Sequence, residues 1–232
     1  MSTKPIHLDI SLSDKNSLGC GIYAIAITLN SLGFKLNHTE LKELAIKISS
    51  EVEFGSIYTQ STMDKILNEL SNQLDNFSYE KKYFSHPCDL DSIVSEGIVN
   101  NGYVLIPYYA MQGAVYKESK PKMHHGHWAV IYDIKNGKLF GTQSNWRADN
   151  NKCLDGIEVT KFIESNSCLN SIKINWGKYN KCKVDIPRKQ LEITPRCGKL
   201  HSCSKITQEC TEDFKCIYVS DLSNVAYILR RG

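Results

Sequence analysis

The stretch HWAVIYDIKNGKLFGT, residues 127–142, carries the strongest signal for the fold class of this chain. Residues 128–134 are rich in β-branched and aromatic side chains, as strands are. Asn136-Gly137 is a strong signal for a two-residue hairpin turn, because both central positions of such a turn take positive φ. The stretch therefore predicts an antiparallel hairpin in which residues 139–142 pair back on residues 128–134.

Beyond this hairpin, the chain before residue 100 has mainly helical patterns, and strand patterns dominate after it. Helices are predicted at residues 20–32, 61–74, 89–99 and 159–165. Another helix is predicted after Asn37 and Glu40, which have capping-box spacing. Further strands are predicted at residues 103–109, 172–175, 216–219 and 225–229. Helices followed by an antiparallel sheet indicate the α+β class.

Composition limits the function classes. The 232 residues can bury a sizeable core, and their formal net charge is only +3. Basic and acidic residues alternate along most of the chain, so we expect no nucleic-acid partner. No apolar run approaches the roughly 20 residues of a membrane span, and the N-terminal residues lack a signal-peptide pattern. The expected location is the cytoplasm, with no membrane partner.

Cys20 is a candidate nucleophile because it follows Gly19 at the predicted start of the first helix. Unpaired backbone N–H groups and the positive end of the helix dipole meet at that position. Both stabilise the thiolate, which is the nucleophilic form of cysteine. Gly19 and Gly21 leave room for a substrate carbonyl, whose developing oxyanion could accept from the Cys20 backbone N–H. The alternative interpretation is a buried core cysteine.

His127 is the candidate general base. We expect it directly before the strand at residues 128–134, with its imidazole projecting toward Cys20. A helix-start cysteine followed about a hundred residues later by such a histidine is the order that papain-like peptidases use. The imidazole would take the thiol proton and later protonate the leaving amine. The returning strand brings Gln143 or Asn145 back to orient the imidazole, and the sequence does not separate these two.

A metal site is the competing interpretation of the histidine cluster. His124, His125 and His127 have the spacing i, i+1 and i+3, which does not converge on one face of a helix or strand. The chain also has no HExxH and no CxxC motif that could complete a zinc site. We therefore expect neither a metal nor a cofactor.

Several longer motifs resemble known peptidases. Residues 20–33, CGIYAIAITLNSLG, resemble the nucleophile helix of C39-like peptidases, a papain-like group. Residues 104–108 (VLIPY) and 124–130 (HHGHWAV) resemble the Leu-Ile-Pro-Tyr and His-x-x-His-Trp-Ala-Val motifs of the actin maturation proteases. Residues 164–169 (ESNSCL) resemble a Glu-Ser-Asn-x-x-Leu segment of that family. The motifs follow the family's order and cover roughly residues 15–175.

The resemblance implies a papain-like fold whose nucleophile helix packs on the antiparallel sheet. It implies a cysteine aminopeptidase that removes an acetylated first residue from immature actin, with Cys20 as nucleophile and His127 as base. The family has an oxyanion-hole glutamine where this chain has Lys15, and neighbouring Asn16 is the candidate replacement. The family's Gln-Gly-Lys-Ser reads Gln143-Ser-Asn-Trp146 here. These departures support the alternative of a non-catalytic protein that binds a peptide or actin on a decayed peptidase scaffold.

The chain divides at about residue 180 in the expected domain organisation. Residues 1–180 form the peptidase domain of the resemblance, and residues 181–232 form a cysteine-rich extension packed on the same domain. Five of the nine cysteines lie after residue 180. Their spacing fits no common zinc pattern, so unpaired thiols, a zinc site and disulfides all stay open for this extension.

Overall fold

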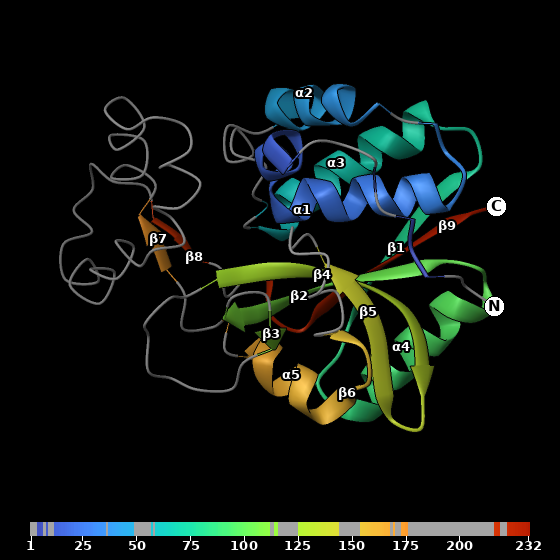
Figure 1. Cartoon of the computed structure of the whole chain (residues 1–232), viewed down its shortest axis with the longest axis vertical. Coiled ribbons are helices and arrows are strands. Elements are labelled where there is room, and N and C mark those ends of the chain that lie inside the picture. The colour runs from blue at the N-terminus through green and yellow to red at the C-terminus, as the bar shows by residue number, and fades with distance from the viewer. Residues whose placement is uncertain are drawn as a thin grey trace.

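The computed structural model of the chain has an antiparallel sheet with helices on both of its faces (Figure 1). The structure describes residues 4–6, 8, 12–35, 37–48, 57, 59–111, 114–115, 125–143, 154–167, 169, 173–175, 216–218 and 222–232. The helices are α1 (Leu12–Ser31), α2 (His38–Ile48), α3 (Gln60–Gln73), α4 (Pro87–Val99) and α5 (Val159–Ser167). The strands are β1 (Phe77–Tyr83), β2 (Tyr103–Met111), β3 (Ala114–Val115), β4 (His125–Lys135), β5 (Lys138–Gln143), β6 (Ile157–Glu158), β7 (Lys173–Asn175), β8 (Cys216–Tyr218) and β9 (Val225–Arg231). These elements confirm the α+β class.

The main sheet has the strand order β1-β9-β2-β4-β5-β6, with β3 paired to β2. All of its described pairs are antiparallel. The last strand of the chain, β9, lies between β1 and β2, with Tyr227 opposite both Lys81 and Leu105. The sequence predicted β9 as a short strand but not this interior position. Of residues 181–232, the structure describes 216–218 and 222–232.

Two apolar clusters sandwich the sheet. In β2, Tyr103 and Leu105 belong to one cluster, while Val104, Ile106 and Tyr108 belong to the other. This alternation follows from the two-residue period of a strand. The first cluster also contains side chains of α1, α2 and α3, and the second contains side chains of α4 and α5. Figure 1 shows the same two layers, with α1, α2 and α3 on one side of the sheet and α4 and α5 on the other.

Polar side chains set the helix starts, and only some of them were predicted from the sequence. The side-chain oxygen of Asn37 accepts from the Thr39 backbone N–H at 2.9 Å and begins α2, as predicted. Thr59 caps α3, because its hydroxyl oxygen accepts from the Thr62 backbone N–H at 3.2 Å. Each cap satisfies a backbone donor that has no partner inside the helix.

The predicted hairpin is confirmed. Asn136 and Gly137 have φ values of 52° and 69°, as a type I′ turn requires, and they join β4 to β5. One detail of the prediction was wrong, because β4 begins at His125 and not at Trp128. His127 therefore lies inside the strand, where its backbone pairs with that of Tyr108 on β2.

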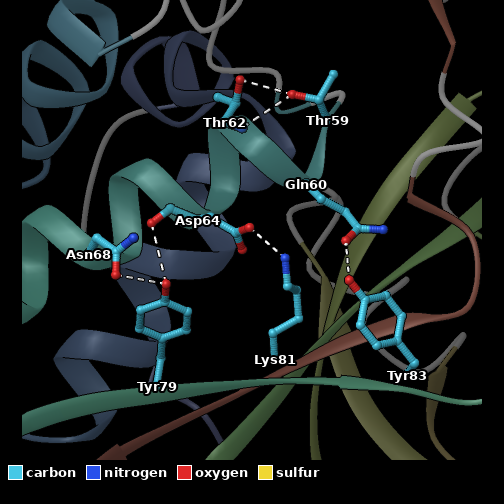
Figure 2. A network of polar contacts seen from close by, with 8 residues as sticks. All are labelled: Thr59, Gln60, Thr62, Asp64, Asn68, Tyr79, Lys81 and Tyr83. Atoms are coloured by element: carbon cyan, nitrogen blue, oxygen red, sulfur yellow. Dashed lines mark hydrogen bonds and ion pairs between the residues drawn. The ribbon is translucent and has the colours of Figure 1, made fainter.

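The edge strand β1 was not predicted from the sequence, because its residues FSYEKKY are largely polar. Figure 2 shows how α3 covers it through pairs of polar side chains. Tyr79 donates to Asn68 Oδ1 at 2.9 Å and Tyr83 donates to Gln60 Oε1 at 2.9 Å, while Lys81 and Asp64 form an ion pair between them. Steps of four residues on a helix and two on a strand both advance about 6–7 Å, so the pairs stay in register.

Gly97 allows α4 to approach the sheet closely. A Cβ at this position would lie 2.7 Å from Val104 Cγ2 and 3.5 Å from Ile228 Cγ2. We predict that Gly97→Ala lowers the free energy of unfolding by about 1 kcal/mol, because overpacking exceeds the gain in helix propensity. Chemical denaturation measures the change.

The matched control for Gly97→Ala is Ser92→Ala, an exposed position on the same helix. It should leave the stability nearly unchanged, since its replacement meets no sheet atom. A free energy of unfolding for Gly97→Ala equal to or above that of the wild type would contradict the close contact at Gly97.

Candidate active site

Cys20 lies where the path of α1 changes. Helical structure spans Leu12–Ser31, but Gly19 has φ 67° and ψ 168°, which lies outside the helical region. This combination is open essentially only to glycine. The element is therefore two helical segments joined at a kink, and the second segment begins at Cys20. The predicted start at Cys20 is confirmed for this second segment, whereas the helical segment before Gly19 was not predicted. Cys20 occupies the end of the second segment where backbone N–H groups point away from the helix.

Ile57 connects the start of this helical segment to β4. A Cβ at Gly21 would lie 2.9 Å from the Ile57 side chain, so the backbone beside Cys20 is packed closely against Ile57. The carbonyl of Ile57 accepts from Trp128 Nε1 at 3.1 Å in the buried core. One residue thus contacts the positions that directly follow Cys20 and His127. Cys20 itself is half-buried and packs against the cluster that contains Trp128.

His127 lies on the face of the sheet that α5 covers. Its ring stacks on that of Tyr108, with 6.0 Å between ring centroids and 28° between ring planes, and its Nδ1 atom is buried. Tyr108 belongs to the second cluster, whereas Trp128, one residue after His127, belongs to the first. Cys20 and His127 lie on α1 and β4, two elements that pack together. Cys20 packs against the first cluster, whereas the ring of His127 stacks on a residue of the second. Their catalytic pairing stays a prediction.

Of the two candidates for the third catalytic residue, Gln143 is the one that the structure describes. It is fully buried at the end of β5 and lies opposite Ala129. Its position is therefore diagonal to His127 on the same face, a spacing of about 7–8 Å that long side chains can bridge. Asn145 and His124 lie outside the described residues. Asn16 lies in the first segment of α1, and its side chain is outside the described part of the chain.

The α5 residues that contact Tyr108 and Pro107 were not predicted from the sequence as part of the site. Phe162 packs its ring on Tyr108 with 5.5 Å between centroids. Asn166 is fully buried, donates from Nδ2 to the Pro107 carbonyl at 2.7 Å and accepts from the Asn224 backbone N–H at 2.7 Å. An asparagine inside a short helix was the available signal, because asparagine is a poor helix former and needs partners when buried.

Metal binding has no support within the described residues. No group of three or more His, Cys, Asp or Glu side chains gathers there in a way that could hold an ion. The backbone of His125 is part of β4, but its side chain is not described. In the same part of the chain, no helix has the length and apolar character needed to cross a membrane.

Comparisons with known proteins do not assign this site to a family. The chain matches no model of a known protein family and no curated protein sequence.

The kink at Gly19 generates a prediction about Cys20. Gly19→Ala forces a strained backbone that costs about 1–3 kcal/mol, or it moves the start of the helical segment. We expect this variant to react more slowly at Cys20 with iodoacetamide, because the sulfur leaves the helix end that stabilises a thiolate. Mass spectrometry of the alkylated peptide measures the rate, with the exposed Cys88 as internal reference.

Gly137→Ala is the control for strain alone. Gly137 also has positive φ, 69°, but it lies in the β4–β5 turn, where an added Cβ would meet no atom within 4 Å. This variant should lose stability without any change in the alkylation of Cys20. Equal rates in both variants would show that the kink does not set the reactivity of Cys20.

Proposed function

We propose that this chain is a papain-like cysteine peptidase of the aminopeptidase type that removes the N-terminal, acetylated residue of immature actin in the cytoplasm. The observation that carries the chemistry is the backbone of Gly19, which starts a helical segment at Cys20. The choice of actin as substrate depends on the resemblance of residues 104–108, 124–130 and 164–169 to the actin maturation proteases.

In the proposed reaction, the Cys20 thiolate attacks the carbonyl carbon of the first peptide bond. The resulting oxyanion accepts from the backbone N–H of Cys20. The imidazolium of His127, which holds the thiol proton, gives it to the leaving amine as the C–N bond breaks. Water then attacks the thioester with His127 as base, which releases the acid and restores the thiol. Gln143, on the same face as His127, is the candidate to orient the imidazole.

The proposed mechanism needs the imidazole of His127 within hydrogen-bonding distance of the Cys20 sulfur when substrate is bound. His127 is the third residue of β4. Catalytic hydrogen bonds of enzymes commonly shorten only when substrate binds. We therefore expect the contact between the two groups to be shortest with substrate at the helix start.

One observation favours the second candidate function, a non-catalytic protein that binds a peptide or actin. The stacking of His127 on Tyr108 directs the ring to the α5 face, away from the cluster that Cys20 joins. A decayed site could keep such an arrangement, as it could keep Lys15 in place of the family's glutamine.

Incubation with actin N-terminal peptides, acetylated and free, separates the two functions. Mass spectrometry should detect loss of the first residue from the acetylated peptide. Cys20→Ala should abolish this cleavage, and His127→Ala should reduce it by on the order of a hundredfold or more, as expected for loss of a general base.

Cys88→Ala is the matched control, since Cys88 is an exposed cysteine on α4 and should have no role in cleavage. Unchanged cleavage by Cys20→Ala would rule out its assignment as nucleophile. Binding of the peptide by the wild-type chain without any cleavage would favour the non-catalytic alternative.

A further inference from the structure

We propose that Asn166 is a positioning residue for the His127 imidazole, acting through β2 and the ring of Tyr108. The structural part of this inference concerns the fold alone. Its consequence for catalysis rests on the proposed function, in which His127 is the base.

The side chain of Asn166 connects β2 and β9 where their backbone pairing ends. The pairing of β2 with β9 covers Tyr103–Leu105 and ends at the pair Leu105 and Tyr227. Two residues further along β2, the Pro107 carbonyl accepts from Asn166 Nδ2, and the backbone N–H of Asn224, directly before β9, donates to Asn166 Oδ1. A side-chain amide has one donor group and one acceptor, as a peptide unit has. Asn166 therefore continues the connection of the two strands at the point where they separate.

The position of Pro107 determines that of Tyr108. Pro107 lies opposite Trp128, and Tyr108 lies opposite His127. Proline has no backbone N–H, so its carbonyl is the only backbone group of this residue that can form a hydrogen bond. Both hydrogen bonds of Asn166 are short, at 2.7 Å, and its side chain is fully buried, where a lost partner is costly.

The position of α5 affects the imidazole of His127 through a row of three packed rings. Phe162 lies one helical turn before Asn166 on α5, so both side chains project from the same face of the helix. The Phe162 ring packs on Tyr108, and the Tyr108 ring stacks on His127, with centroid distances of 5.5 and 6.0 Å. The helix α5 thus contacts β2 at two points, the backbone carbonyl of Pro107 and the ring of Tyr108.

The alternative is that Asn166 only stabilises the fold. A structural residue would lower the free energy of unfolding when substituted but would leave the surroundings of His127 as they are. The two roles therefore differ in a spectroscopic signature of the imidazole, because the stacked Tyr108 ring shifts its resonances.

The test uses the full chain labelled with ring-¹³C histidine. His127→Gln assigns the His127 signal among the seven histidines. Asn166→Asp keeps the acceptor for Asn224 but puts an oxygen against the Pro107 carbonyl, and Phe162→Leu removes the supporting ring while keeping an apolar side chain. We expect both variants to shift the His127 resonances. We also expect kcat for the acetylated peptide to fall on the order of tenfold to a hundredfold, with KM changed less than about twofold, as misplacement of a catalytic group does.

Thr59→Ala is the matched control, because it also removes one side-chain to backbone hydrogen bond, at the start of α3. It should lower the stability by about 1 kcal/mol and change neither the resonances nor kcat. If the His127 resonances in both α5 variants equal those of the wild type, the inference is overturned. The resonances need no turnover, so a wild-type chain that fails to cleave would refute the proposed function while this test still decides the role of Asn166.

Discussion

The pairing of β2 with β4 fixes the surroundings of the helices and of the candidate site. These two strands lie at the centre of a sheet that is covered on both faces, so successive residues of each strand enter opposite apolar clusters. Val104 and Leu105 lie in opposite clusters, as do Ala129 and Val130, so a one-residue change of register would send every side chain of the strand to the other cluster and repack both. This register places Tyr108 against His127 and Pro107 against Trp128, and it thereby determines what surrounds each of them.

The site follows from elements that this pairing holds together. Trp128 points to the first cluster and donates to Ile57, which also packs against the helix start at Gly21. His127 points to the second cluster, where Tyr108, Phe162 and the buried Asn166 gather. A cysteine and a histidine from distant parts of the chain thus come to neighbouring elements, while α5 supports the histidine from its own side of the sheet.

Much of this fold could be predicted because local signals agree with the tertiary structure. Asn136-Gly137 specifies its turn, and Asn37 specifies a helix start, each through a requirement of the backbone itself. The strand β1 could not be predicted in the same way, since at the sheet's edge it is stabilised by polar pairs such as Tyr79 with Asn68. Nor does any local signal show that β9, from the far end of the chain, enters the middle of the sheet. The candidate site shows the same division. The helix start at Cys20 was predictable because the backbone at position 19 needs a glycine. The face to which His127 points was not predictable, because the strand residues that follow it are apolar and buried on both faces of the sheet.

A catalytic pair of Cys20 and His127 would make the thiol reactive below its ordinary pKa. An unassisted thiol with a pKa of about 8.5 is less than about 1% thiolate at pH 6. The most direct measurement is the alkylation rate of Cys20 at pH 6 and pH 9, with Cys88 as internal reference, in the wild-type chain and in His127→Ala. We expect Cys20 of the wild type to keep much of its reactivity at pH 6 and His127→Ala to lose it by at least about tenfold. The same pH dependence in both proteins, equal to that of Cys88, would contradict the pairing.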